Sequence, residues 1–589
     1  MCGISAYYGN DIVEDVLVSF LMKLEYRGYD SSGIAVKDNN NIIITKDSYK
    51  VEDLKSNIKT KHKGLGIGHT RWATHGEANK TNAHPHISNN KEWCVVHNGI
   101  IENFAELKTM LIENGYSFYS ETDSEVIPNL LEYKGVKNVA DFISAISMLK
   151  GSFAICAISS NLNEMYIARN LSPIYVSTTE NGTYVSSDPI CFTDINPEYY
   201  SMENNEFAVV FDNKVVFYDN KCNVVNKKVY LLNSKYTHTN KEIYTTFMEK
   251  EIHEIPIVFE NIIKEYIDFN YMRNIPNDIY DIDNIVIIGC GTAYHSGLIG
   301  ATYLKTALNI SVETHLASEY LVSDPIISPN SLYIFVSQSG ETADTLQCLR
   351  LVKDKCRYTM AITNVVYSTL AKSVDIVLPV FAGPEIAVAS TKAYNAQLLI
   401  FYLLAKYLEG HALSIEYLNR LKSKLNKLDI SHLYYHNKLK EIIPNYDSVF
   451  ILGKYTDYYT ALEASLKLRE ITYHNISALP SGELKHGTLA LITENTTCII
   501  IATKAGTLHK NLNSIHEIKA RGGKVILVTE LDIDTNENID YIIKLPAIDE
   551  SIIDIISIIP FQILALEESI YLGYNPDKPR NLAKSVTVE

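Results

Sequence analysis

The sequence lacks the features that mark membrane, nucleic-acid-binding and disulfide-rich proteins. Its longest apolar stretch, residues 552–566, is interrupted by Asp554, Pro560 and Gln562, so we expect no membrane-spanning helix. No basic block stands out in a chain with a net charge of −16, which disfavours contact with nucleic acids or anionic membranes. The nine cysteines are scattered and form no C-x-x-C pair, as expected of free thiols in a reducing compartment.

The N-terminus also lacks a charged segment followed by an apolar run, so we expect no cleaved leader and a cytoplasmic location. What is present is ordinary globular composition, with 46% apolar and 21% charged residues. At 589 residues, the chain should fold as several domains.

Many short β segments with turn signals between them occupy the first part of the chain, up to about residue 230. Asn181-Gly182, for example, separates two apolar runs by only a few residues, which requires a hairpin and hence antiparallel pairing. Amphipathic helices are predicted at residues 12–25, 103–113, 124–131 and 139–150. This pattern predicts an α+β domain with stacked antiparallel sheets.

The pattern of predicted secondary structure changes near Lys241. A polar helical stretch is predicted at residues 244–266, and the strands that follow become fully apolar. These strands, at residues 285–288, 332–336, 360–363 and 376–378, alternate with helical patterns, as in a parallel sheet buried on both faces.

The same order and spacing of predicted strands then recur further along the chain. Residues 449–453 mirror 285–289, residues 498–503 mirror 332–337, and residues 540–546 mirror 375–379, with nearly equal spacing between the three anchors. We interpret this as an internal duplication of one doubly wound unit, which would place a cleft between two similar lobes. The alternative is that two α/β domains share a rhythm by chance.

Cys2 is a candidate nucleophile. Removal of the initiator methionine would leave it with a free α-amine, whose unperturbed pKa is about 8, so nucleophile and base would belong to one residue. A cysteine at this position can also be incidental. Three further segments add weight: RGYDS at 27–31, HTRWATHG at 69–76 and HNGIIEN at 97–103.

Together these segments resemble the class II (N-terminal nucleophile) glutamine amidotransferases. The resemblance implies an αββα fold, in which the thiolate attacks the side-chain amide of glutamine and releases ammonia as a thioester forms. It implies that Asn98 and the Gly99 N–H form the oxyanion hole. The implied glutamine-binding residues are Arg71 for the α-carboxylate, Asp123 for the α-ammonium, and Trp72, Thr74 and His75 in the same pocket. Ala6 stands where the family usually has glycine.

For several of these residues, the neighbouring sequence also suggests a purely structural role. Asn98-Gly99 is also a good hairpin turn, and Asp123 could cap a helix that begins near Ser124. The histidine-rich stretch could suggest a metal, but no cysteine or acidic residue falls at zinc spacing, so we expect no metal and no cofactor. The histidines concerned are His62, His69, His75, His84, His86 and His97.

The second half carries a candidate phosphate cradle. Tyr294 stands where a dinucleotide fingerprint starting at Gly289 needs its third glycine, which excludes that cofactor reading. The next strand ends in SQSGET at 337–342, where hydroxyls at a helix N-terminus suit a phosphate, unless they are an ordinary helix cap.

Together with VASTK at 388–392, this set resembles sugar isomerase (SIS) domains, which bind phosphosugars. The resemblance implies a sugar-phosphate site in the first lobe alone, because the second lobe lacks the hydroxyl cluster. The implied residues are Thr292, Ser337, Gln338, Ser339, Thr342, Val388 and Ser390.

The second lobe contributes Lys467 and Glu470, three residues apart on one predicted helix face, where a surface ion pair is the alternative. It also contains SGELKHG at 481–487, and the chain ends in PRNLAKSVTVE. The whole order resembles the family of glutamine–fructose-6-phosphate aminotransferases (isomerizing), or glucosamine-6-phosphate synthases.

That resemblance implies conversion of D-fructose 6-phosphate and L-glutamine to D-glucosamine 6-phosphate and L-glutamate, the first step of hexosamine (UDP-N-acetylglucosamine) biosynthesis, with ammonia channelled between two sites. Lys584 would form a Schiff base with the ketose, and Glu470 would move a proton between C1 and C2. His486, from a neighbouring subunit, would open the sugar ring, and Lys467 would assist proton handling. Ala293 and Thr488 depart from the family pattern.

We therefore predict five segments: an amidotransferase domain at 1–218, a linker with a connecting helix at 219–274, two α/β doubly wound parallel-sheet SIS domains at 275–415 and 416–579, and a tail at 580–589 that closes the sugar site. The expected partners are the two small substrates and a second copy of the chain, bound through the SIS domains.

Two other functions stay open. One is another glutamine-dependent amidotransferase, such as an amidophosphoribosyltransferase, and the other is a phosphosugar-sensing SIS regulator, which would not need Lys584.

Overall fold

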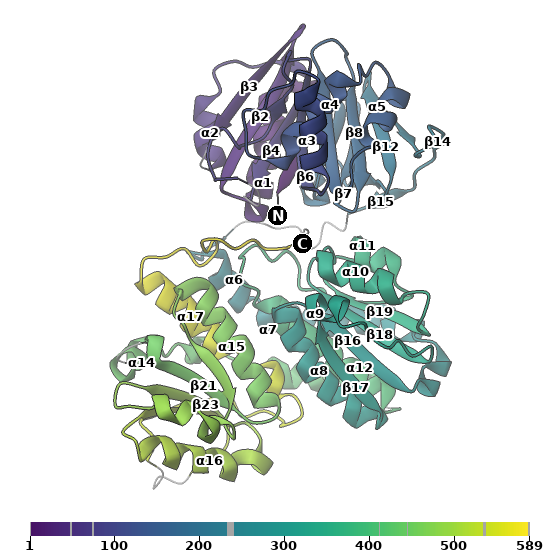
Figure 1. Ribbon diagram of the computed structural model, residues 1–589. Coiled ribbons are helices and arrows are strands. Elements are labelled where there is room, and N and C mark those ends of the chain that lie inside the picture. Colours follow the sequence, from purple (N-terminus) through teal and green to yellow (C-terminus); the bar gives the residue numbers. More distant parts are fainter. Residues whose placement is uncertain are drawn as a thin grey trace. The chain divides into compact units, whose positions relative to one another are not determined.

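The computed structural model describes residues 2–47, 50–72, 76–232, 241–410, 413–443, 446–533 and 538–586. The chain forms two compact units, Met1–His238 with Ala583–Glu589, and Thr239–Leu582. Each unit contains both helices and sheets (Figure 1). None of the described helices combines the length and the apolarity that crossing a bilayer requires.

Two antiparallel sheets form the first unit. The eight-stranded sheet has the spatial order β15 (Val229–Leu231), β11 (Glu198–Ser201), β9 (Tyr175–Thr179), β10 (Gly182–Ser186), β1 (Gly3–Ile12), β4 (Lys63–Arg71), β2 (Ser31–Asp38), β3 (Asn41–Asp47). The seven-stranded sheet has the order β14 (Val224–Val225), β13 (Lys214–Tyr218), β12 (Glu206–Phe211), β8 (Met165–Asn170), β7 (Gly151–Ser159), β6 (Trp93–Ile101), β5 (His86–Ile87). The hairpin predicted at Asn181-Gly182 is confirmed, because β9 and β10 pair directly across it.

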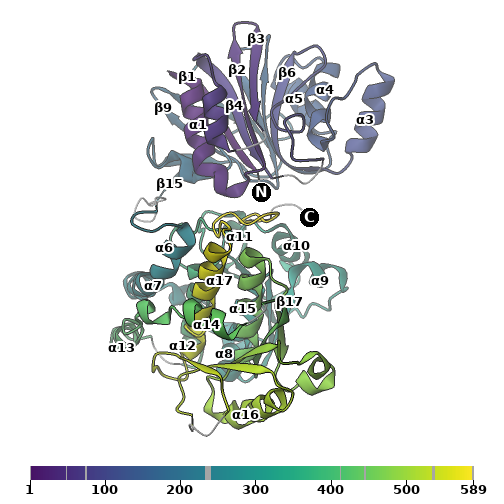
Figure 2. The ribbon, with the colours of Figure 1, turned by 90° about the vertical axis from the view of Figure 1, so that its left-hand side faces the viewer.

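Helices cover the outer face of each sheet, as Figure 2 shows. The eight-stranded sheet carries α1 (Val13–Leu24) and α2 (Val51–Asn57), and the seven-stranded sheet carries α3 (Phe104–Glu113), α4 (Val126–Tyr133) and α5 (Val139–Ile146). The predicted αββα architecture is therefore confirmed.

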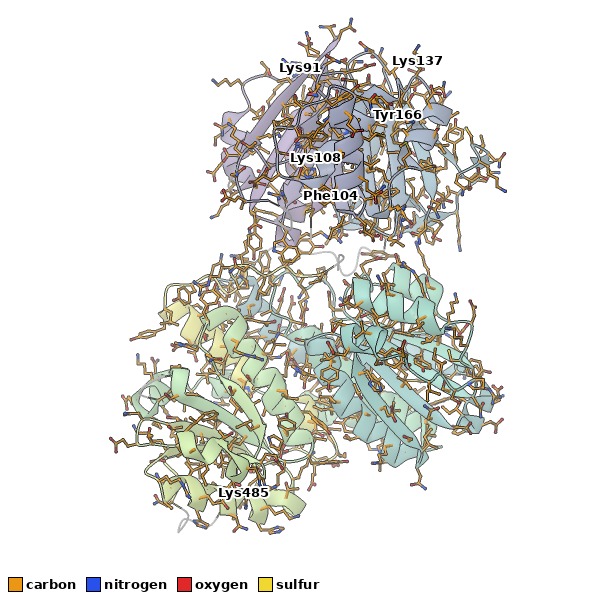
Figure 3. All side chains as sticks on the ribbon, in the orientation of Figure 1. Lys91, Phe104, Lys108, Lys137, Tyr166 and Lys485 are labelled. Atoms are coloured by element: carbon orange, nitrogen blue, oxygen red, sulfur yellow. The ribbon has the colours of Figure 1, made fainter. Side chains whose placement is uncertain are left out.

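Alternation along β6 explains how this sheet is buried on both faces. Trp93 and Val95 point to the core under α3–α5, whereas Cys94 and Val96 point to the core between the two sheets. Tyr166 of β8, labelled in Figure 3, packs edge-on against Trp93 at 5.6 Å between ring centroids. Since both faces of the sheet meet a hydrophobic layer, its central strands read as continuous apolar runs.

The second unit contains two parallel sheets of five strands each. The first has the order β17 (Ser311–Leu316), β16 (Asn284–Gly289), β18 (Ser331–Ser337), β19 (Tyr358–Thr363), β20 (Ile376–Pro379). The second has the order β22 (Ser477–Pro480), β21 (Val449–Gly453), β23 (Thr497–Ile501), β24 (Lys524–Thr529), β25 (Tyr541–Lys544). Both sheets follow the same order of second, first, third, fourth and fifth strand, which confirms the predicted duplication.

Helices surround these sheets (Figure 1). They are α8 (Thr292–Leu308), α9 (Ala317–Val322), α10 (Ala343–Val352), α11 (Thr369–Ser373), α12 (Lys392–Leu408), α13 (Ile415–Leu425), α14 (His436–Ile442), α15 (Thr456–Thr472), α16 (Ala505–Lys519) and α17 (Ile559–Tyr571). Helices α8 and α15, which occupy equivalent places in the two lobes, pack against each other. One hydrophobic core runs through both lobes.

The polar helical stretch predicted at residues 244–266 forms two helices, α6 (Phe247–His253) and α7 (Ile255–Phe269), so the prediction of helix is confirmed. The predicted polar character was wrong, because α7 buries Ile255, Val258, Phe259, Ile262, Ile263 and Tyr266 in the core of the second unit. These residues recur every three or four positions, so they form one apolar stripe against α12 and α13.

Candidate active sites

The start of β1 brings Cys2 to a point where both sheets of the first unit meet. Strand β4 runs antiparallel to β1, with Thr70 opposite Gly3, so the end of β4 returns to the start of β1. There the Trp72 N–H donates to Cys2 Sγ at 3.4 Å. From β6 in the other sheet, Asn98 Nδ2 donates to the Cys2 carbonyl oxygen at 3.0 Å. Three predicted site residues therefore come together from distant parts of the sequence.

Asn98 and Gly99 lie inside β6, opposite Ala154 and Phe153 of β7. The hairpin-turn alternative is therefore wrong. Gly99 has a φ of +128°, and a Cβ at this position would overlap the Ser152 carbonyl oxygen. Both the backbone conformation and the close approach of β7 require glycine here.

Charge and burial shape the reactivity of this site. Burial raises the pKa of the Cys2 thiol, while the Trp72 N–H and the Arg71 guanidinium oppose that shift. The thiol is thus mostly protonated near neutral pH and needs a base to become the nucleophile. Burial lowers the pKa of Arg71, opposed by Cys2, Asp30 and Asp123, and an arginine remains cationic in such surroundings.

Asp123 is buried, and its negative charge acts on the Arg71 guanidinium. Its Oδ2 accepts from the Ile101 N–H at 2.7 Å, and its Oδ1 accepts from the Ser124 hydroxyl at 3.2 Å. It lies inside the short 3-10 helix Asp123–Glu125, which begins after Thr122, so the helix-cap alternative is wrong. Two further predicted glutamine-binding residues, Thr74 and His75, lie outside the described residues.

The second candidate site follows from the strand order of the first lobe. Strands β16 and β18 are neighbours, and the connections leaving them cross to opposite sides, so their carboxyl ends flank the crevice in which such folds bind ligands. Those ends are Gly289 and Ser337. The predicted sugar-phosphate residues 337–342 and Thr292 come directly after them.

Hydroxyl groups brace the loop after β18. Ser337 Oγ accepts from the Gly340 N–H at 3.0 Å and lies 3.0 Å from Thr342 Oγ1, while Ser339 Oγ accepts from the Glu341 N–H at 3.2 Å. Thr342 is the N-cap of α10 but makes no side-chain cap bond, so its hydroxyl does not serve as an ordinary cap. The loop thus presents polar groups at the N-terminus of α10, where an anion is favoured.

Two predicted sugar-phosphate hydroxyls already contact carboxylates. Thr292 Oγ1 donates to Glu463 Oε1 at 3.0 Å, and Ser390 Oγ donates to Glu385 Oε2 at 2.9 Å. Val388 contributes its backbone N–H to the Asp577 carbonyl oxygen at 3.1 Å. The assignment of these residues to the sugar phosphate stays a prediction.

Lys467 and Glu470 of α15 form a partly buried pair and not an exposed surface pair. The Lys467 side chain is 1% exposed and that of Glu470 is 21% exposed, and the Lys467 ammonium lies 2.7 Å from Glu470 Oε2 and 3.4 Å from Glu463 Oε1. Burial alone would lower the pKa of Lys467, but Glu463 and Glu470 outweigh it and raise that pKa. Lys467 is therefore a fixed positive charge at this site.

Sequence reasoning missed three buried or partly buried members of this cluster. Glu463 is fully buried, and its Oε2 lies 2.7 Å from His295 Nδ1. Glu385 adds negative charge near Lys467. Glu463 could have been found, since it precedes Lys467 by four residues on the same helix face. Glu385 and His295 had no comparable signal.

His486 and Lys584 are the remaining predicted catalytic residues. His486 ends the short 3-10 helix Leu484–His486 and is exposed, and the described residues offer its imidazole no hydrogen bond. Its neighbour Lys485, labelled in Figure 3, lies beside α16 with Nζ 3.1 Å from Glu517. Lys584 is half-buried. Their roles stay predictions.

Comparisons with known proteins agree with this architecture. A family model described as "Glutamine amidotransferase domain" matches residues 69–194, and one described as "SIS domain" matches residues 278–407 and 442–570. Fold and matches together define a glutamine amidotransferase joined to a duplicated sugar isomerase unit.

Relatives that match over the whole chain identify one family within this class. The glutamine–fructose-6-phosphate aminotransferase (isomerizing) of Clostridium acetobutylicum is 39% identical, and that of Staphylococcus aureus strain N315 is 36% identical, each over the full length of both chains. The solved C-terminal domain of the glucosamine-fructose-6-phosphate aminotransferase from Francisella tularensis is 30% identical with a TM-score of 0.51, and the match covers 58% of this chain and 100% of that one. The chain belongs to the family of glutamine–fructose-6-phosphate aminotransferases (isomerizing).

Proposed function

We propose that this protein transfers the amide nitrogen of L-glutamine to D-fructose 6-phosphate, and so forms D-glucosamine 6-phosphate and L-glutamate. This reaction would supply the first step of hexosamine biosynthesis. The observation that carries the proposal is the meeting of Cys2, Trp72 and Asn98 in a chain that matches this family from end to end.

In the glutaminase half, the Cys2 thiolate attacks the amide carbon of glutamine, and ammonia leaves as the C–N bond breaks and a thioester forms. Water then hydrolyses the thioester to L-glutamate and the free thiol. Because burial raises the pKa of the thiol, a base must take its proton, and the α-amine of Cys2 would do so once Met1 is removed. The Asn98 amide and the Gly99 N–H stabilise the oxyanion. The guanidinium of Arg71 binds the α-carboxylate of the substrate, and Asp123 binds the α-ammonium group.

In the sugar half, Lys584 forms a Schiff base with the open-chain ketone and releases water, ammonia then displaces the lysine amine at the same carbon, and Glu470 moves the proton between C1 and C2. The raised pKa of Lys467 supports a role as a permanent positive charge beside Glu470, not as a proton donor. The hydroxyls of Ser337, Ser339 and Thr342 hold the phosphate at the N-terminus of α10.

Ammonia passes between the two sites inside the protein. Only neutral ammonia is nucleophilic, and a path that excludes water prevents its protonation and loss. Trp72 would control this passage, and the hydrogen bond from its N–H to Cys2 Sγ supports this role.

We further propose a cytoplasmic homodimer that associates through the SIS domains. All nine cysteines are free, which fits a reducing compartment. The exposed imidazole of His486 fits a residue that serves the sugar site of a neighbouring subunit.

Replacement of Cys2 tests the division of labour. Cys2→Ala should abolish glutamine-dependent formation of amino sugar, because no nucleophile remains, while isomerisation of fructose 6-phosphate to glucose 6-phosphate persists. Both activities can be measured in coupled assays on the same preparation. Loss of both in a folded protein would contradict the proposal.

Replacement of Lys584 tests the other half. Lys584→Ala should keep glutamine hydrolysis detectable but abolish amino-sugar formation, because the ketone is no longer captured. Amino-sugar formation at the wild-type rate would refute the role of Lys584.

A further inference from the structure

Four buried histidines lie next to the glutaminase site, and the mechanism above uses none of them. They are His69, His84, His86 and His97, which are 0–4% exposed. The rings of His69 and His84 are stacked, with centroids 4.2 Å apart, and His86 packs edge-on against His84 at 4.6 Å. Of these four, His69 is the one that contacts a predicted catalytic side chain.

His69 Nε2 lies 2.9 Å from the His97 carbonyl oxygen and 3.0 Å from Asn98 Oδ1. A carbonyl oxygen can only accept a hydrogen bond, so Nε2 must carry the hydrogen. The Asn98 atom that faces the same N–H must then be the oxygen, which turns the Asn98 NH2 group toward Cys2. The orientation of this carboxamide is therefore fixed by the contacts themselves.

We propose that His69 is a positioning residue for glutamine hydrolysis: its Nε2–H holds the Asn98 carboxamide so that the NH2 group, and not the oxygen, faces the developing oxyanion. The proposal rests on the oxyanion-hole role proposed above for Asn98. Without this donor, the carboxamide can turn over and present an acceptor to a negative charge, which removes stabilisation of the transition state.

The surroundings keep His69 in the required form. Burial lowers its pKa to about 3, so the ring is neutral near pH 7. Its Nδ1 is buried and has no hydrogen bond among the described residues, so a second ring hydrogen there would be buried and unpaired. The neutral Nε2–H tautomer is the one that satisfies both acceptors.

Two variants distinguish the effect of losing the hydrogen-bond donor from the effect of changing the side-chain volume. His69→Leu removes the N–H but keeps an apolar group of similar size, whereas His69→Gln keeps a side-chain N–H donor. We expect glutaminase kcat to fall on the order of 10- to 100-fold in His69→Leu, short of the roughly 10²- to 10³-fold loss of a whole oxyanion donor, with KM for glutamine nearly unchanged. His69→Gln should recover most of the lost kcat.

A double-mutant cycle with Asn98→Ala gives the decisive readout. If His69 acts through Asn98, His69→Leu has no further effect on kcat when Asn98 is already replaced. Losses that multiply would overturn the proposal, and so would a wild-type kcat in His69→Leu. A wild-type kcat in Asn98→Ala alone would instead refute the proposed role of Asn98.

Control measurements keep the result interpretable. His62 pairs with Glu14 at 2.6 Å outside the four-histidine cluster, so His62→Leu should leave kcat unchanged. Trp72 and Trp93 both lie in this unit, so their fluorescence during thermal unfolding reports whether each variant is folded. If His69→Leu does not fold, His69→Asn, whose side chain is too short to reach Asn98, replaces it, and a wild-type kcat would again overturn the proposal.

Discussion

Glu463 is expected to hold the two lobes of the second unit together. Its carboxylate is fully buried on α15 of the second lobe and reaches two residues of α8 in the first lobe, Thr292 at 3.0 Å and His295 at 2.7 Å. It also lies 3.4 Å from the Lys467 ammonium. Glu463→Gln keeps the size and one acceptor oxygen but removes the negative charge.

The size of the effect follows from burial. Breaking a buried ion pair by neutralising one partner costs about 3–5 kcal/mol, because the other charge stays buried. Lys467 is 1% exposed, but Glu470 remains 2.7 Å from its ammonium and compensates in part. We therefore expect Glu463→Gln to lower the free energy of unfolding of the second unit by about 3 kcal/mol.

The positions of the tryptophans provide an internal reference for the assay. Both tryptophans, Trp72 and Trp93, belong to the first unit, so their fluorescence follows that unit, whereas far-ultraviolet circular dichroism follows both. In a denaturant titration, Glu463→Gln should move part of the dichroism transition to lower denaturant concentration and leave the fluorescence transition unchanged.

Glu416→Gln is the matched control. Glu416 forms an exposed pair with Arg420 at 3.5 Å, and such pairs contribute at most about 1 kcal/mol. A dichroism transition of Glu463→Gln that coincides with that of the wild type would refute the reasoning.

Two further predictions concern a glycine and a buried acid. Gly99→Ala should abolish glutaminase activity and lower the thermal stability of the first unit, seen by tryptophan fluorescence, because a Cβ overlaps the Ser152 carbonyl oxygen; an active variant of wild-type stability would contradict this. Burial raises the pKa of Asp457 to about 6, above the value of about 3.9 for an unfolded chain. Since the folded state binds this proton more tightly, the contribution of Asp457 to stability is greatest below about pH 4 and falls by about 3 kcal/mol as the pH rises to about 6. Asp457→Asn should remove this fall, so parallel stability curves for wild type and variant between these pH values would show the assignment to be wrong.

Most central strands of the second unit were predicted because they are buried on both faces, but the central strand β24 was missed. Among the edge strands, β20 and β25 were predicted, whereas β17 and β22 were missed because their patterns are ambiguous, as in SVETHL of β17. Helix α7 was misjudged as polar because its apolar stripe becomes visible only when residues three and four apart are compared.

Local sequence signals are misleading where tertiary strand pairing decides the conformation. Asn98-Gly99 reads as a turn, yet the pairing of β6 with β7 extends it as strand and uses the glycine for a close approach. The meeting of Cys2 with Asn98 depends on two different sheets, and no spacing rule encodes it. The motifs shared with amidotransferases predicted this grouping of Cys2 with Asn98, which local propensity and spacing could not.

Transfer of nitrogen from glutamine to the sugar is the central claim, and isotope labelling tests it most directly. The protein is incubated with fructose 6-phosphate and glutamine labelled at the amide nitrogen, in the presence of excess unlabelled ammonia, and the sugar product is examined by mass spectrometry. We expect hexosamine phosphate that carries the label. Unlabelled hexosamine phosphate would contradict internal transfer, and hydrolysis of glutamine without any amino sugar would contradict the proposed reaction itself.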